Sequence, residues 1–358
     1  MDPKAGDISL PVDLIRTVAI ILVILLHASA EPNFNVAQMS SQGVQLWWAS
    51  DIYGSFARTC IPLFVMLTGV LLLQPNKADE PLGLFFRKRL RRIGVPFIFW
   101  GAAYFAWDFL VDHQINYQPI SVGSIVNGLL TGPDYQFWFL YLLLGLYLFT
   151  PIFRIFVKNA RWEVLRYFLL LWFIGTAVVP ILGLFTPYTL DANLFVLTGW
   201  VGYFVLGAYL IQLHVRRGIL LLSFIFGSIW TIIGTYLIVA TLGERVSTFF
   251  LDAYSFNIIV ASAALFLLLA SVSSQTVETK LPHGNRVIKL IGQNTLPIFL
   301  FHVIVLETLQ RGYLGFKISL NTMDPIVEIP LITAMTLLIC LAVILPLKKI
   351  PHMKRIIG

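Results

Sequence analysis

Three ionisable residues in the first apolar segment have types and a spacing that could support chemistry. Asp13, Arg16 and His27 lie within DLIRTVAIILVILLHASA, where ten residues separate the arginine from the histidine. Ionisable side chains at membrane depth are costly and are retained mainly where they face protein or a cavity. On a helix this step gives about 1100° of rotation and about 16 Å of rise, so Arg16 and His27 share one face at two depths. Such a stripe suits an elongated ligand.

The chemistry of these side chains leaves two interpretations open. An imidazole has an ordinary pKa near neutrality, so His27 is a candidate general base. A single histidine inside a membrane helix is also often a structural hydrogen-bond partner. Asp13 and Arg16 have the i, i+3 spacing of an ordinary ion pair near the cytoplasmic interface.

The composition indicates an all-α integral membrane protein with many spans. Hydrophobic residues make up 58%, charged residues 12%, and the mean hydropathy is +0.83. The apolar runs are continuous over about 20 residues, which fits helical spans. They exclude a transmembrane β-barrel, whose strands alternate apolar and polar residues. We expect a bundle of about ten transmembrane helices, near residues 12–31, 53–73, 93–111, 135–153, 165–183, 194–212, 219–240, 254–272, 289–310 and 326–346.

The loop charges predict that both termini are cytoplasmic. With the N-terminus inside, 20 of the 25 Lys and Arg residues fall on the cytoplasmic side, three fall outside and two lie within spans. This is the bias of the positive-inside rule. The net charge of +7 is therefore interpreted as an insertion signal and a match to anionic lipids, not as a sign of nucleic-acid binding. We expect a multi-pass protein of the cell membrane, with membrane lipids among its partners.

Two further ionisable residues are predicted at a depth similar to that of His27. Taking about 1.5 Å per residue, His27 lies about 22 Å from the cytoplasmic edge, and Arg58 and His302 lie within one or two turns of that height. This layout is typical of a buried polar chamber. Alternatively, the Arg58 side chain could extend to the outer membrane interface. Trp138 could likewise be an ordinary interfacial aromatic residue without a functional role.

A basic segment, LGLFFRKRLRR over residues 82–92, precedes the third span. Arg89 and Arg92 are three residues apart and can present two guanidinium groups to one polyanion. The same segment is also suited to anchoring on anionic lipid, and both interpretations are compatible.

Other kinds of site have little support in the sequence. Cys60 and Cys340 fall in separate predicted spans without metal-ligand spacing, so we expect no disulfide, no cysteine chemistry and no metal. The first span imitates a signal peptide, but Arg16 and His27 interrupt that pattern, so we expect the span to be retained. We expect one membrane domain over residues 1–358, with no soluble domain attached.

Several segments together resemble the acyltransferase family 3 membrane enzymes. DLIRTVAIILVILLH is similar to their opening helix, in which an Arg and a His are separated by ten residues, often after an Asp. SFARTCIPLFVMLTGVLL resembles the second helix, with Thr68 in a position where the family commonly has Ser. FFRKRLRRIGVPFIFW resembles the basic Arg-x-x-Arg loop, with Arg89 and Arg92 in those positions. QFWFLYLLLGLYLFTPIF resembles the Trp-Phe-Leu helix, and NTLPIFLFHVIVL resembles the late Tyr-x-x-His helix, with Phe299 and His302.

The resemblance implies an acyltransferase that moves an acyl group, usually acetyl, from cytoplasmic acyl-CoA to a hydroxyl of an extracytoplasmic glycan or lipid-linked sugar. The compact length is similar to that of single-domain sugar O-acetyltransferases such as the one acting on enterobacterial common antigen. We expect His27, with Arg16, to be catalytic, and Arg16, Arg89 and Arg92 to bind the acyl-CoA co-substrate. Substrate contacts are expected from Asp13, Arg58, His302 and Trp138.

A second class of function remains open from the sequence. Buried charges also line the pathways of transporters and flippases that move a polar solute or a lipid-linked sugar. Many such proteins are built from two related halves, and this chain has no convincing internal repeat, which counts modestly against that class. The sequence specifies neither the acceptor nor the oligomeric state.

Overall fold

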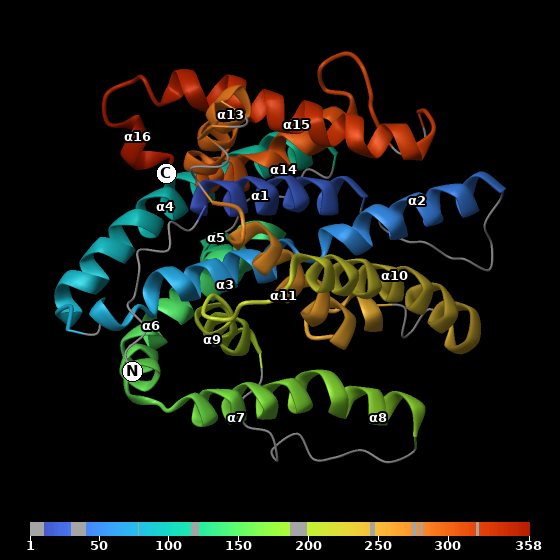
Figure 1. The fold of residues 1–358 in the computed structure, drawn as a ribbon. Helices are drawn as coiled ribbons and strands as arrows, with labels where there is room; N and C mark the ends of the chain where they lie inside the picture. The colour runs from blue at the N-terminus through green and yellow to red at the C-terminus, as the bar shows by residue number, and fades with distance from the viewer. Residues whose placement is uncertain are drawn as a thin grey trace. The chain divides into compact units, whose positions relative to one another are not determined.

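The computed structural model describes residues 11–29, 41–77, 79–115, 122–186, 199–243, 248–273, 278–279, 282–319 and 322–358, and over these residues it is helical, without strands. Figure 1 shows the helices in chain order. Their bounds are α1 Val12–Ser29, α2 Ser41–Ala57, α3 Cys60–Leu72, α4 Leu82–Ile115, α5 Val122–Thr131, α6 Trp138–Asn159, α7 Trp162–Phe173, α8 Val179–Phe185, α9 Trp200–Leu210, α10 Arg217–Leu242, α11 Phe256–Ala270, α13 Pro282–Gln293, α14 Thr295–Arg311, α15 Pro325–Leu347 and α16 Met353–Ile356.

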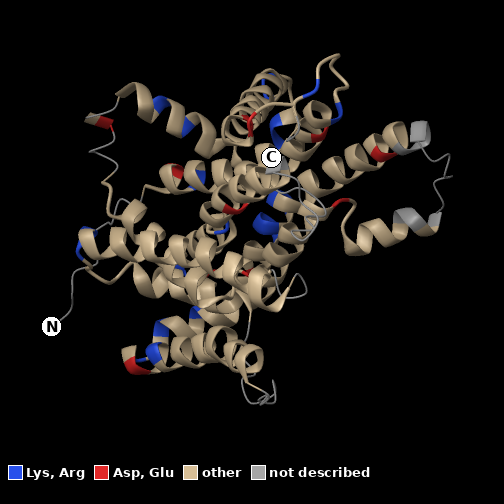
Figure 2. Ribbon diagram, turned by 90° about the vertical axis from the view of Figure 1, so that its right-hand side faces the viewer, with Lys and Arg blue, Asp and Glu red and all other residues tan. Residues whose placement is uncertain are grey.

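The membrane-spanning class is confirmed, but the count of about ten spans is not. Among the described residues, eight helices or joined helices are long and apolar enough to cross a membrane, or nine if α13 and α14 form one span. Figure 2 shows long stretches of these helices without a charged residue. The predicted span over 194–212 corresponds to α9, which has only 11 residues in its described helix. The cytoplasmic placement of the termini stays a prediction.

Two of the predicted spans differ in form from the structure. The second begins at Gly43 rather than near residue 53, because α2, which carries polar residues, and the apolar α3 follow one another in one candidate span of 30 residues. The ninth is not one continuous helix, since it is divided into α13 and α14 with Asn294 between them. Periodicity over 20 residues reports the apolar content of a segment and does not report a break within it.

The chain divides into two compact units, each formed from two separate stretches of sequence. The first comprises Met1–Gln74 and Val157–Gln293, and the second comprises Pro75–Phe156 and Asn294–Gly358. The prediction of a single domain over 1–358 is not tested by this division, since both units draw on distant parts of one chain.

In the first unit, α1 packs against α2, α3 and α13, α3 packs against α9, and α10 packs against α11. Glycines allow α3 and α9 to approach very closely. A Cβ atom at Gly69 would lie 1.8 Å from the carbonyl oxygen of Phe204, and one at Gly207 would lie 2.2 Å from that of Met66. Small residues at helix contacts are the usual means of tight association in membranes.

In the second unit, side chains of α4 bind the C-terminal elements at successive heights. The Trp100 indole donates to the carbonyl of Ile357 at 3.2 Å, and the Tyr104 hydroxyl donates to that of Leu300 at 2.9 Å. The Trp107 indole donates to the Glu307 carboxylate at 2.9 Å. These contacts fix α4 against α14 and against the segment that follows α15.

Candidate functional site

The α1 helix carries Arg16 and His27 on a face that is buried in the folded chain. Ile20 and Val23 lie between them on the same stripe, at the i+4 and i+7 positions from Arg16, and are 0% and 1% exposed. Arg16 and His27 are themselves half-buried. The stripe therefore faces protein rather than lipid, as the cost of an ionisable group in a membrane requires.

The N-terminal end of α1, which the predicted topology places on the cytoplasmic side, is held in place by α13. The Thr17 hydroxyl donates to the carbonyl of Ile288 at 2.9 Å, which bridges the two helices. Gly292 approaches so closely that its Cβ would lie 2.7 Å from the carbonyl oxygen of Asp13. Asp13, predicted to contact substrate, lies in the first turn of α1, where an acidic residue complements the helix dipole. These contacts set the position of α1, and hence the stripe that carries Arg16 and His27.

Arg58 lies where α2 ends and α3 begins, within the 30-residue span that starts at Gly43. It is therefore deeper along its span than a start near residue 53 implied. A Cβ atom at Gly54 would lie 3.5 Å from the Ser29 hydroxyl of α1. Since Arg58 is four residues from Gly54 and His27 two from Ser29, the structure places Arg58 and His27 at similar heights in the first unit.

A further ionisable residue, Asp51, lies on α2 within the same 30-residue span as Arg58. Asp51 is 8% exposed and accepts a hydrogen bond from Ser55 at 3.4 Å. Asp51 is a residue that the sequence reasoning missed, because it was placed outside the membrane when the second span was started too late. With the span at its observed length, Asp51 meets the same criterion of an intramembrane charge that singled out Arg58.

His302 belongs to the second unit, on α14, and is 0% exposed. Its Nδ1 atom lies 2.7 Å from the carbonyl oxygen of Phe299. Because a carbonyl oxygen only accepts, Nδ1 carries a proton, and in the neutral ring Nε2 is the acceptor atom. This geometry fixes the orientation of the ring. It is compatible with the structural interpretation and with a catalytic one.

Trp138, predicted to contact substrate, is the first residue of α6 and is 43% exposed. The following residue, Phe139, is 6% exposed and packs on Phe299 with ring centroids 5.1 Å apart. Of the two neighbours Trp138 and Phe139, it is thus Phe139 that packs on α14, one turn before His302. Trp138 has the exposure expected of an interfacial aromatic residue.

In the basic segment at the start of α4, the side chains of Arg89 and Arg92 lie in different surroundings. Arg89 is half-buried, with its guanidinium 5.5 Å from the ring centre of Phe85 and 5.9 Å from that of Tyr147. Arg92 is exposed and lines a pocket of about 670 Å³ together with Lys88. The two arginines thus lie in different surroundings, although their spacing allowed one shared anion.

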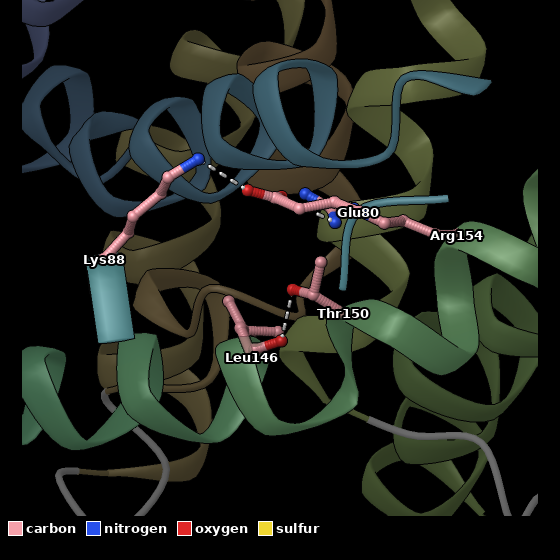
Figure 3. A network of polar contacts seen from close by, with 5 residues as sticks. All are labelled: Glu80, Lys88, Leu146, Thr150 and Arg154. Atoms are coloured by element: carbon pink, nitrogen blue, oxygen red, sulfur yellow. Dashed lines mark hydrogen bonds and ion pairs between the residues drawn. The ribbon is translucent and has the colours of Figure 1, made fainter. Parts of the chain in front are cut away.

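A partly buried group of ion pairs supports this basic segment. Glu80 accepts from Lys88 at 3.0 Å and from Arg154 at 3.1 Å, as Figure 3 shows. The Lys88 hydrogen bond and the Arg154 pair hold the pKa of Glu80 below its usual range, although desolvation opposes them. Arg154 is only 2% exposed and lies 4.6 Å from the ring centre of Phe85. Sequence reasoning missed Glu80, for which the available signal was the acidic pair Asp79–Glu80 just before a strongly basic run.

No group of three or more His, Cys, Asp or Glu side chains in the described part of the chain lies close enough together to hold a metal ion. Cys60 and Cys340 are buried free thiols.

The fold and the buried ionisable stripe define a helical multi-pass membrane protein with intramembrane polar groups. The chain belongs to the acyltransferase 3 family, whose acyltransferase domain model matches residues 11–345. It is therefore an acyltransferase of the membrane type. Comparisons with curated proteins and with solved structures give no significant match.

Proposed function

We propose that this chain is an acyl-CoA-dependent O-acyltransferase of the cytoplasmic membrane. It transfers an acyl group, expected to be acetyl, to a hydroxyl of an extracytoplasmic glycan or lipid-linked sugar. The observation that supports this most is the stripe on α1, where Arg16 and His27 flank fully buried residues in a chain of an acyltransferase family. An ionisable pair retained on a buried membrane face is expected to be functional.

The donor supplies a thioester at one end of a long arm and phosphate groups at the other. We assign the phosphate groups and the arm to Arg89, Arg92 and Arg16, since guanidinium groups form charge-assisted hydrogen bonds with phosphate. An elongated donor matches a stripe with two levels about 16 Å apart, because its two ends need different partners.

In the transfer step, His27 accepts the proton of the acceptor hydroxyl while its oxygen attacks the thioester carbonyl carbon. The tetrahedral intermediate collapses, the C–S bond breaks and the ester forms. The proton held by His27 passes to the departing thiolate of CoA, so the enzyme returns to its starting state. Direct attack is preferred to an acyl-enzyme, because Ser29, two residues beyond His27, points elsewhere on the helix.

The remaining predicted residues receive supporting roles. Arg58 or His302 stabilises the oxyanion of the tetrahedral intermediate, a contribution that preorganised donors make in acyl transfer. Asp13 and Trp138 are assigned to substrate contacts. For the acceptor, the similarity to single-domain sugar O-acetyltransferases, such as the one acting on enterobacterial common antigen, favours a surface glycan.

Two measurements test this function. Mass spectrometry of surface glycans from cells with and without the chain should show a mass gain of one acyl group only when it is present. Purified protein supplied with radiolabelled acetyl-CoA and a glycan extract should form labelled ester. A transporter or flippase would yield no new ester in either experiment, which would overturn the proposal.

A further inference from the structure

A basic pocket in the second unit has two walls that come from opposite ends of its sequence. One wall is α4, with Lys88, Arg91 and Arg92, and the other is the segment after α15, with His352, Lys354 and Arg355. The pocket has a volume of about 670 Å³, within the range of sites for organic ligands of nucleotide size.

We propose that this pocket binds an organic ligand that carries two or more phosphate groups, and that Lys354 and Arg355 supply one half of its cations. The assignment deepens the proposed function, on which it rests for the natural ligand, since acyl-CoA has such a phosphate-rich end. A phospholipid with two phosphate groups, such as cardiolipin, offers the same chemistry from a second source.

Most of the cations that line the pocket have no acidic side chain paired with them in the described part of the chain, although Gly358 also lines it. Lys88 is paired with Glu80 at 3.0 Å, but in the described part of the chain Arg91, Arg92, Lys354 and Arg355 form no ion pair. Like charges held together repel one another, and a polyanion shared between them removes this cost. Guanidinium groups are suited to phosphate because their donors match its oxygens in pairs.

The three cations of the α4 wall lie on one face of the helix. Lys88, Arg91 and Arg92 occupy positions i, i+3 and i+4, which point the same way. Arg89 lies off this face, against Phe85 and Tyr147. The three cations therefore act on one ligand volume without any change of backbone.

The C-terminal wall is held in a specific conformation. His352 has φ of 70°, the only positive φ at a non-glycine residue in the described chain. Such a conformation costs free energy and persists where the surroundings fix it. Ile357 is 0% exposed and its carbonyl accepts from Trp100 at 3.2 Å, which anchors the segment on α4. Lys354 also lowers the pKa of Lys348, second to desolvation, so positive charge accumulates along this segment.

The test compares two double variants of the full-length purified protein. Lys354→Ala with Arg355→Ala removes two pocket cations, whereas Arg87→Ala with Lys349→Ala removes the same charge, one cation from α4 and one from the segment after α15, at positions that do not line the pocket. All four side chains are exposed, so both variants are expected to fold, and thermal unfolding in detergent checks this.

The first probe is adenosine 3′,5′-bisphosphate, measured by titration calorimetry in neutral detergent. The pocket variant should lose at least tenfold in affinity, and the control variant less than twofold. The second probe is binding to vesicles of phosphatidylcholine with cardiolipin, a lipid that carries two phosphate groups. Selective loss with the pocket variant in either experiment supports the pocket and identifies the source of its phosphate. Equal losses in both variants, or no loss with either probe, would overturn it.

The outcome is separable from that of the proposed function because binding needs no turnover. A chain without acyltransferase activity whose bisphosphate binding still depends on Lys354 and Arg355 would refute acyl transfer and keep the pocket. An active chain whose two variants bind both probes like the wild type would refute the pocket alone.

Discussion

The Arg154 guanidinium lies 3.1 Å from the Glu80 carboxylate, and this contact pairs a cation that is only 2% exposed. Arg154 also lies over the ring of Phe85, which is itself fully buried and carries Arg89 at 5.5 Å. One aromatic ring and one carboxylate thus organise the positive charge at the start of α4. The basic segment keeps its shape because these cations have fixed partners.

Replacement of Glu80 by glutamine should destabilise the protein. The buried Arg154 would lose its neutralising partner, and breaking a buried pair from one side costs about 3 kcal/mol. The midpoint of thermal unfolding in detergent at pH 7 should fall clearly. Glu278→Gln is the matched control, because its pair with Lys289 is half exposed on both sides, at 51% and 48%, and exposed pairs contribute little. Similar midpoints in the two variants would contradict this role for Glu80.

Acidification should remove the same contribution. The folded-state pKa of Glu80 lies below its ordinary value of 4.5, so the stabilisation is fully present above that value. It is lost as the pH falls through the lower, folded pKa. The difference in unfolding midpoint between wild type and Glu80→Gln should therefore be largest near neutrality and shrink below pH 4.5. A difference that stays constant down to pH 3 would show that the carboxylate charge is not its source.

The contact of α3 with α9 should tolerate no added atom. Gly69→Ala places a Cβ 1.8 Å from a backbone oxygen of Phe204, so the helices must separate, at a cost of about 1–3 kcal/mol or more. Gly145→Ala is the matched control within α6, where a Cβ would meet nothing within 4 Å. The midpoint of thermal unfolding should fall for Gly69→Ala. It should stay the same or rise for Gly145→Ala, because alanine favours a helix. Equal stability of the two variants would contradict the close approach.

Apolar run length predicted the helical membrane class, since burial in lipid demands helices whose backbone is satisfied internally. It could not predict the break at Asn294 or the early start of the second span at Gly43, because both depend on tertiary contacts of residues whose local pattern is ambiguous. The helical period placed Arg16 and His27 on one face, and the burial of Ile20 and Val23 is consistent with that. The separation of Arg89 from Arg92 was not predictable from spacing, since Phe85 and Tyr147 decide it.

The two arginines of the basic segment should contribute unequally to donor binding. Arg89→Ala with Arg92→Ala together should weaken acyl-CoA binding, and most of the loss should follow Arg92, because Arg92 lines the basic pocket. Arg89→Ala should lose less affinity and should also lower the unfolding midpoint modestly, since cation–π contacts contribute about 0.5–2 kcal/mol. Calorimetric titration of the single variants with CoA separates these effects. Equal losses in the two singles would assign Arg89 a direct contact, and unchanged affinity in the double variant would leave only lipid anchoring.

Removal of His27 should abolish acyl transfer while leaving the fold intact. His27→Ala takes away the group proposed to accept the hydroxyl proton, and positioned general bases contribute about 10²–10⁴-fold in rate. His27 is only half-buried, so the variant is expected to insert and purify like the wild type. His214→Ala, which removes an exposed loop imidazole, is the control and should retain activity. Ester formation from radiolabelled acetyl-CoA measures both variants, and wild-type turnover in His27→Ala would remove the general-base role.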